Sequence, residues 1–313
     1  LEEALYSNRS EADLAASLEH IMAELAQPAA DEFSPLELSS LNFQSHIEQT
    51  AFEKMVEEAR SLIRRGDMFQ CVLSQRFSAE YSGRPLDHYR NLRVTNPSNY
   101  LYFYDFGDYQ IIGASPESLV SVKQGQVTTN PIAGTRPRGK DEREDKALAK
   151  ELLADEKEVA EHRMLVDLGR NDIGKIAQNN SVEVTKYMEV EYFRYVMHLT
   201  SVVRGQLLPQ LTAMDALKST LPAGTVSGAP KIRAMKRIYE LEQEKRGVYA
   251  GAIGYLSATG DMDFAIAIRT MILKNGRAYV QAGAGIVYDS IPANEYQETI
   301  NKAKSMTKIG EMQ

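Results

Sequence analysis

Residues 262–287, with the sequence MDFAIAIRTMILKNGRAYVQAGAGIV, decide the fold class. They contain two apolar runs, Met262–Leu273 and Arg277–Val287, which are joined by Lys274-Asn275-Gly276. Asn-Gly between two such runs is a strong signal for a tight hairpin turn. We therefore expect two antiparallel strands here, with a third strand before them at Val248–Leu256.

Helices and strands elsewhere do not alternate regularly along the chain. Helices are predicted where apolar residues recur every three or four positions, or where a proline opens the segment. These helices are 14–25, one from Thr50 with Gly66 as its C′ residue, 144–168, one from Pro230 and one from Pro292. Strands are predicted at 69–77, around 182–184 and at 196–203. This order is not a βαβ repeat, and it favours an α+β fold.

The composition is that of a folded chain without a nucleic-acid or membrane partner. Of the 313 residues, 43% are hydrophobic and 25% charged, and no apolar run approaches the ~18 residues that span a bilayer. The formal charge is −7, with no basic block of the kind that follows a phosphate backbone. The single cysteine, Cys71, and an N-terminus without a signal peptide predict a reducing, cytoplasmic setting.

Residues 1–48 and 49–313 are predicted to form different parts of the chain. The first part is acidic and contains the helix at 14–25, followed by Pro28 and Pro35. We interpret it as a helix and linker that remain from an upstream N-terminal region, because the chain begins with Leu1 rather than Met. Residues 49–313 are expected to form one large domain.

Two glycine-rich stretches do not support a nucleotide cofactor. Residues 134–140 match the start of a phosphate-binding loop, but Asp141 stands where the loop needs Ser or Thr to bind magnesium. Gly283-Ala284-Gly285 lacks the third glycine of a dinucleotide fingerprint. The five histidines also lack the spacing of a zinc site.

Two pairs of glutamates point to a metal instead. Glu158 and Glu161 lie one helical turn apart, and Glu295 and Glu298 repeat that spacing near the C-terminus. An arbitrary pair of this kind is more often a solvated helix face. Two such faces brought together would bind a hard divalent cation through oxygen.

Two features of the C-terminal strands indicate a ligand next to this metal. Arg269 interrupts an apolar strand, where an arginine needs an anionic partner, and Gly283 and Gly285 allow close approach to the backbone of the next strand. A metal, an arginine and bare backbone N–H groups suit a small substrate with more than one carboxylate.

Four stretches give a resemblance to a known family. They are PIAGTRPRG at 131–139, DLGRND at 167–172, PAGTVSGAPK at 222–231 and QAGAGIV at 281–287. In these stretches the chain resembles the chorismate-utilising enzymes, and the likeness runs from about residue 50 to 308. It implies an α+β fold of antiparallel sheets packed as a sandwich with flanking helices, and it makes 49–313 the chorismate-binding catalytic domain.

Within that family the chain is most similar to the large subunits of anthranilate synthases. The resemblance implies magnesium-dependent conversion of chorismate and ammonia to anthranilate and pyruvate, in tryptophan biosynthesis. In isochorismate and salicylate synthases a lysine at the position of Gln70 activates water, whereas an amide is not a base. In aminodeoxychorismate synthases a lysine at the position of Ala133 attacks the ring, whereas alanine is no nucleophile.

The resemblance also assigns roles to individual residues. Glu117 matches the general acid that protonates the departing C4 hydroxyl, and His198 matches the histidine linked to loss of pyruvate. Six further positions, together with Gly134, would contact chorismate. They are Thr225, Tyr249, Arg269, Gly283, Gly285 and Lys302, with Tyr249 and Arg269 at the enolpyruvyl carboxylate.

The same resemblance implies a metal and a protein partner. Glu161 and Glu298 would hold Mg²⁺, with Glu158 and Glu295 as further ligands or supports. Ammonia is expected from a separate glutamine amidotransferase subunit, because Cys71 lacks the Gly-x-Cys-x-Gly turn of a glutaminase nucleophile. Asn99 replaces the second proline of the family's Asn-Pro-Ser-Pro-Tyr-Met motif, which alters the expected pocket wall.

Three other functions are open at this point. The first is an aminodeoxychorismate or aminodeoxyisochorismate synthase, against which Ala133 and His198 argue. The second is a truncated chorismate-binding domain without turnover, and the intact set of polar site residues argues against it. The third is a magnesium-dependent hydrolase, which the glutamate pairs alone would allow.

Overall fold

The computed structural model describes residues 9–27, 41–193 and 196–307, which belong to two separate units, Leu1–Pro35 and Leu36–Gln313. The first unit contains helix α2 (Glu11–Leu25), which confirms the helix expected at 14–25. Ser10 caps this helix, since its hydroxyl accepts from the backbone N–H of Asp13. No residue of α2 is buried.

One sheet of the second unit contains the hairpin that the sequence predicts. Its order is β1-β2-β14-β13-β4-β3, with β10 also paired to β2. Asn275 (φ 51°) and Gly276 (φ 70°) form the turn between β13 and β14, whose ends pair Lys274 with Arg277. The strand bounds are β1 Gln44–Ser45, β2 Gln70–Glu80, β3 Tyr100–Asp105, β4 Tyr109–Ser115, β10 Gly228–Ala229, β13 Thr270–Lys274 and β14 Arg277–Ile286.

The other sheet has the order β11-β12-β5-β6-β9-β7, and β8 pairs with β9. Its strands are β5 Ser118–Lys123, β6 Gln126–Thr129, β7 Ile132–Pro137, β8 Glu183–Tyr192, β9 Val196–Gln206, β11 Ala252–Leu256 and β12 Met262–Ile266. All of the described strand pairs in both sheets are antiparallel. The predicted α+β sandwich of antiparallel sheets with flanking helices is therefore confirmed.

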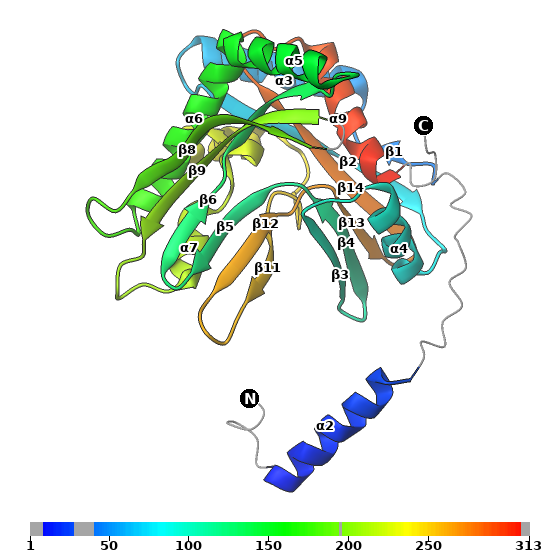
Figure 1. The fold of residues 1–313 in the computed structure, drawn as a ribbon. Coiled ribbons are helices and arrows are strands. Elements are labelled where there is room, and N and C mark those ends of the chain that lie inside the picture. Colours follow the sequence, from blue (N-terminus) through cyan, green and yellow to red (C-terminus); the bar gives the residue numbers. More distant parts are fainter. Residues whose placement is uncertain (1–8, 28–40, 194–195, 308–313) are drawn as a thin grey trace. The chain divides into compact units, whose positions relative to one another are not determined.

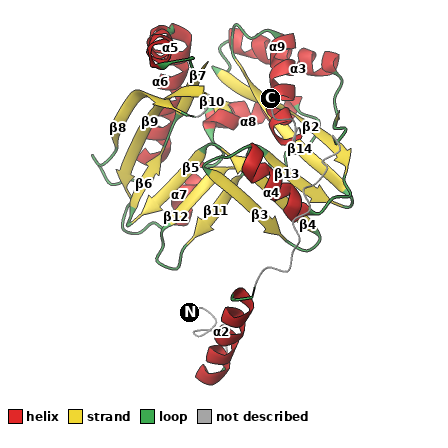
Figure 2. Cartoon of the chain, turned by 45° about the vertical axis from the view of Figure 1, so that its right-hand side comes forward, coloured by secondary structure: helices red, strands yellow, loops and turns green. Residues whose placement is uncertain are grey.

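Helices cover the outer sides of the two sheets (Figures 1 and 2). They are α3 Gln49–Arg64, α4 Pro85–Thr95, α5 Glu142–Ala154, α6 Glu156–Gly174, α7 Ala213–Thr220, α8 Lys231–Leu241 and α9 Pro292–Thr307. Helices α3 and α9 pack together, with the rings of Phe52 and Tyr296 5.8 Å apart. Helix α6 packs on β7 and β9 of the other sheet, so α6 and α9 stand over different sheets.

Three expected elements are divided or shifted in the structure. The helix expected at 144–168 is two helices, because Asp155 is extended and its carboxylate caps the N–H groups of Lys157 and Glu158. The strand expected at Met262–Leu273 is β12 and β13, which belong to different sheets. Pro230 precedes α8 as its N-cap residue rather than its first helical residue.

Two of the places at which the chain passes between the sheets lie side by side. Glu117 lies between β4 and β5, and Arg269 lies between β12 and β13 with φ +49°. The two passages are joined by backbone hydrogen bonds, from Ile266 N to Glu117 O and from Ala114 N to Arg269 O, both 3.0 Å long. The sequence placed Arg269 inside a strand, and this expectation is wrong. Arg269 lies at the junction of the two sheets.

Apolar side chains on both sheets anchor this junction. One core cluster, which includes Val120, Val203 and Ile266, lies beneath α6 and α7. Another includes Phe52, Leu73 and Ile286, between β2, β14, α3 and α8. Among the described helices, none combines the length and apolar character needed to cross a bilayer.

Candidate active site

A cavity of about 740 Å³ lies where the two sheets meet α6 and α9. All fourteen site residues expected from the sequence line it. They are Gln70, Glu117, Gly134, Glu158, Glu161, His198, Thr225, Tyr249, Arg269, Gly283, Gly285, Glu295, Glu298 and Lys302. The structure thus brings together residues that span 233 positions of the chain, from 70 to 302 counted inclusively.

Glu117 is a carboxyl group that can hold a proton near neutral pH. Burial raises its pKa to about 7, although a hydrogen bond from Thr225 and the positive charges of Lys302 and Arg269 act in the opposite direction. The Thr225 hydroxyl donates to Glu117 Oε1 at 2.9 Å. This hydrogen bond fixes one carboxyl oxygen, so a protonated Glu117 can use the other as an acid.

His198 on β9 is held by strand β7. Its Nδ1 lies 3.0 Å from the Gly134 carbonyl oxygen and 3.0 Å from Thr135 Oγ1. A carbonyl oxygen only accepts, so Nδ1 of the neutral ring carries the proton and Nε2 keeps its lone pair. The imidazole can therefore accept a proton at Nε2.

The cationic side of the cavity contains Arg269 and Lys302. The Lys302 ammonium donates to the Gly283 carbonyl at 3.0 Å and pairs with Glu298 at 2.5 Å. Burial lowers the pKa of Arg269, and the acidic side chains of Tyr249, Glu117 and Glu298 partly oppose this shift. A half-buried guanidinium in a cavity is suited to bind a carboxylate, because a bound carboxylate removes both groups from water.

Four glutamates form the acidic side of the same cavity. Burial and the charge of Glu161 raise the pKa of Glu158, and burial and the charge of Glu298 raise that of Glu295, against a hydrogen bond from Ser290. Lys157 at the start of α6 lowers the pKa of Glu295 on α9, and the glutamates of both helices line the same cavity.

These glutamates fit a magnesium ion by their chemistry, although they do not form a finished metal centre. In the described part of the chain, no group of three or more His, Cys, Asp or Glu side chains is placed to hold a metal. The donors are all oxygens, as magnesium prefers, and magnesium is commonly bound by one or two carboxylates together with water and the anionic groups of a substrate. The set therefore fits a metal that shares its ligands with a bound anion.

Gln70 lies at the acidic side and cannot itself act as a base. Its Nε2 donates to Glu161 Oε1 at 3.3 Å, which identifies the amide as a donor to the carboxylate. A Cβ built on Gly285 would lie 2.8 Å from the same Nε2. The Gln70 amide thus lies near both Gly285 and Glu161.

Sequence reasoning missed several residues of this cavity. They are Thr135, Lys157 and Ser290. The loop of residues 96–99 before β3 also lines the cavity, as expected from the sequence for the pocket wall at Asn99. Thr135 belongs to the motif at residues 131–139, so this motif could have identified it as a residue of the site. Ser290 and Lys157 carry no such signal, because their position depends on how α6 and α9 approach each other.

This fold and this cavity belong to a known class of protein. Over residues 2–308 the chain matches the chorismate binding enzyme family, and it belongs to that family. It is 58% identical, over 99% of its length, to anthranilate synthase component 1 of Lactococcus lactis, and 51% identical, over 93% of its length, to that of Pseudomonas aeruginosa. It spans 68% and 60% of these two proteins.

Solved structures of two related enzymes have a similar fold. Anthranilate synthase component I of Streptococcus pneumoniae is 78% identical, with a TM-score of 0.91, and the match covers 97% of this chain and 68% of that one. The menaquinone-specific isochorismate synthase of Escherichia coli is 25% identical, with a TM-score of 0.83, over 95% of this chain and 68% of that one.

Proposed function

We propose that this chain carries out the anthranilate synthase reaction, converting chorismate and ammonia to anthranilate and pyruvate in tryptophan biosynthesis. The observation that carries the proposal is the single cavity in which an acid, a base, two cations and four carboxylates meet. The relatives named anthranilate synthase component 1 support it. Gln70 and Ala133 argue against activation of water and against a covalent lysine adduct.

The first proposed step adds nitrogen to the ring. Ammonia attacks C2, the ring double bonds shift, and the C4 hydroxyl leaves as water with a proton from Glu117. A carboxyl group with a pKa of about 7 is suited to this, because much of it is protonated at neutral pH. The product of this step is aminodeoxyisochorismate, which still carries the enolpyruvyl group.

The second proposed step makes the ring aromatic. His198 Nε2 takes the proton from C2, and the enolpyruvyl group leaves from C3 and becomes pyruvate after it gains a proton. The hydrogen bonds of His198 Nδ1 to strand β7 support this assignment, since they leave Nε2 as the basic nitrogen. Aromatisation makes the step strongly favourable.

The proposed substrate contacts divide between the two ends of the cavity. Arg269 and Tyr249 would bind the enolpyruvyl carboxylate, while Gly283, Gly285 and Lys302 would bind the ring carboxylate. Gly134 and Thr225 would line the ring. Glu161 and Glu298 would hold Mg²⁺, supported by Glu158 and Glu295, and the bound cation would neutralise the charge of the ring carboxylate.

Ammonia is proposed to come from a separate glutamine amidotransferase. The thiol of Cys71 is buried, and burial raises its pKa to about 12, so it is not a nucleophile for glutamine. We also propose that the enzyme works in the cytoplasm.

Anthranilate formation is expected to depend on magnesium and on Glu298. With chorismate, ammonium and Mg²⁺, anthranilate fluorescence should rise, and chelation of the metal or Glu298→Gln should abolish the rise. Glu142→Gln is the matched control, because Glu142 is an exposed carboxylate of α5 outside the cavity. Unchanged rates after chelation or in Glu298→Gln would contradict the proposed metal site.

Gly283→Ala is expected to weaken chorismate binding more than Gly285→Ala. A Cβ on Gly283 would lie 2.6 Å from the Tyr249 hydroxyl and 2.9 Å from the backbone oxygen of Leu73. A Cβ on Gly285 meets only the side-chain amide of Gln70 closer than 3.0 Å, and no backbone atom. Overpacking of ~1–3 kcal/mol corresponds to a KM for chorismate raised about 10-fold in Gly283→Ala. Equal KM values for the two variants would contradict the proposed chorismate contact at Gly283.

A further inference from the structure

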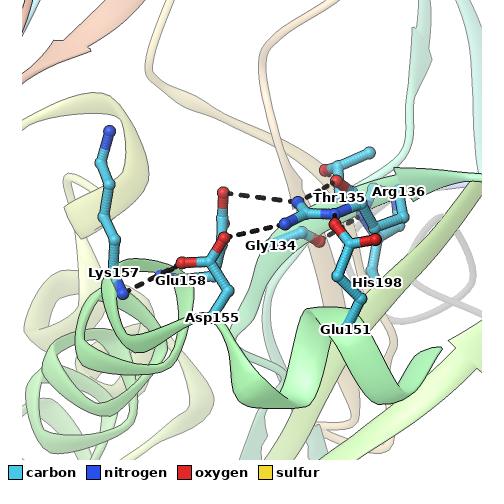
Figure 3. A network of polar contacts seen from close by, with 8 residues as sticks. All are labelled: Gly134, Thr135, Arg136, Glu151, Asp155, Lys157, Glu158 and His198. Carbon is cyan, nitrogen blue, oxygen red and sulfur yellow. Dashed lines mark hydrogen bonds and ion pairs between the residues drawn. The ribbon is translucent and has the colours of Figure 1, made fainter. Parts of the chain in front are cut away.

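Arg136 stands at the centre of a polar network beside the cavity (Figure 3). It lies on β7, next to Gly134 and Thr135, and its side chain is 19% exposed. Its Nε donates to Glu151 Oε1 at 3.0 Å, and its second terminal nitrogen donates to Asp155 Oδ2 at 2.8 Å. The remaining nitrogen donates to the Thr135 carbonyl at 3.0 Å.

The network connects strand β7 with the start of helix α6. One carboxylate oxygen of Asp155 accepts a hydrogen bond from Arg136. The other oxygen accepts from the N–H groups of Lys157 and Glu158 at 3.1 and 3.2 Å. Arg136 is also 3.9 Å from Glu158 Oε1. The break between α5 and α6 is therefore held against β7 by one guanidinium.

Both ends of this connection reach the cavity. On the strand side, the Gly134 carbonyl and the Thr135 hydroxyl contact His198 Nδ1. On the helix side, Glu158 lies so close to Gly134 that a Cβ there would be 3.3 Å from Glu158 Oε2. Gly134 has a φ of +67°, a conformation that favours glycine. A shift of α6 relative to β7 would therefore change the distance between Glu158 and the Gly134 carbonyl that accepts from His198.

We infer that Arg136 is a positioning residue, which sets strand β7 and the start of helix α6 so that His198 and Glu158 keep a fixed relation across the cavity. The inference rests on the proposed function, since His198 and Glu158 are its proton acceptor and metal support. Arg136 does not touch the substrate cavity itself, and it acts through the Gly134–Thr135 backbone and through Asp155.

The geometry requires arginine rather than any cation. A planar guanidinium has five N–H donors and can bind Glu151, Asp155 and a carbonyl at once, whereas a lysine ammonium is a single point charge. Arg136→Lys therefore keeps the positive charge but removes the planar set of donors that binds several acceptors at once. Changes to groups that orient metal or catalytic residues typically reduce metal affinity or activity about 10–100-fold.

The test compares Arg136→Lys with Arg237→Lys. Arg237 is the matched control, because its guanidinium also binds two carboxylates, Asp67 and Glu240, and is 21% exposed, but it lies outside the cavity. We expect Arg136→Lys to raise the half-saturating Mg²⁺ concentration about 10-fold, and to raise the ratio of released aminodeoxyisochorismate to anthranilate by a similar factor. Arg237→Lys should leave both quantities unchanged.

A second variant and a second readout keep the test decisive. Asp155→Asn retains a good helix cap but loses the charge that binds Arg136, so it should reproduce the Arg136→Lys phenotype if that variant does not fold. Nitrogen-15 NMR of the histidines, with His198 assigned through His198→Gln, should show the proton on Nδ1 in the wild type and a mixture of tautomers in Arg136→Lys. If Arg136→Lys and Arg237→Lys behave alike in all readouts, Arg136 is only a structural residue and the inference fails. If the wild type makes no anthranilate, the proposed function fails, whereas the NMR comparison still decides on Arg136.

Discussion

Replacement of His198 by glutamine is expected to stop anthranilate formation after the first chemical step. The glutamine amide has no basic nitrogen that could take the C2 proton. The intermediate aminodeoxyisochorismate should therefore be released with its enolpyruvyl group still attached. Loss of a general base typically lowers a rate about 10²–10⁴-fold, and we expect anthranilate production to fall by at least the lower figure. Addition of nitrogen does not use His198 in this scheme, so chorismate should still be consumed.

The outcome can be read by separating the reaction products. Liquid chromatography with mass detection distinguishes aminodeoxyisochorismate from anthranilate, and pyruvate is measured in the same sample. The control is His46→Gln, because His46 contacts Ser78 and Glu244 outside the cavity. Normal anthranilate formation by His198→Gln, or loss of chorismate consumption with an intact fold, would assign His198 a different role.

Replacement of Glu117 by glutamine is expected to block the first step. Glutamine keeps the acceptor for the Thr225 hydroxyl but carries no acidic proton, so the C4 hydroxyl would leave unassisted. We expect kcat/KM for chorismate to fall about 10²–10⁴-fold without release of the intermediate. Accumulation of aminodeoxyisochorismate in this variant would place Glu117 in the second step instead.

The raised pKa of Glu117 also predicts a pH dependence. As an acid, Glu117 must be protonated in the free enzyme, so kcat/KM should decrease as the pH rises through about 7. Free ammonia increases with pH, and the profile must therefore be measured at constant free ammonia. The residual activity of Glu117→Gln should lack this decrease, and an unchanged decrease in the variant would show that another group causes it.

Burial of this carboxyl group should cost stability at alkaline pH. Its pKa is raised in the folded state from 4.5 to about 7, so the folded protein holds the proton more tightly than the unfolded chain. The stabilisation is complete below the unfolded pKa and is lost as the pH rises through the folded pKa. The difference corresponds to about 3 kcal/mol, and Glu117→Gln should reduce the loss of unfolding free energy between about pH 5 and pH 9 by a similar amount.

Local features of the fold were predictable where a few adjacent residues determine them. The Asn275-Gly276 turn, the helix that Gly66 follows and the helix that Pro292 opens depend on backbone preferences of neighbouring residues, and all three are present. The divided elements were not predictable in this way. At the break, Asp155 both caps α6 and binds Arg136, which lies 19 residues earlier.

The site shows the same division between local and distant causes. The motifs and glutamate spacing named residues that do meet in one cavity, because each motif is short and chemically specific. Arg269 was noticed as an arginine in an apolar run, but its place between the sheets follows from sheet order, which periodicity does not contain. The Arg136 network combines β7, α5 and α6, and only their packing reveals it.

The most direct test of the central proposal supplies the wild-type chain with chorismate, Mg²⁺ and nitrogen-15 ammonium, and measures both products by mass spectrometry. We expect anthranilate that contains the heavy nitrogen, formed in equal amount with pyruvate, and no anthranilate when glutamine replaces ammonium. Isochorismate as the product, or heavy nitrogen retained only in a ring that keeps its enolpyruvyl group, would contradict it.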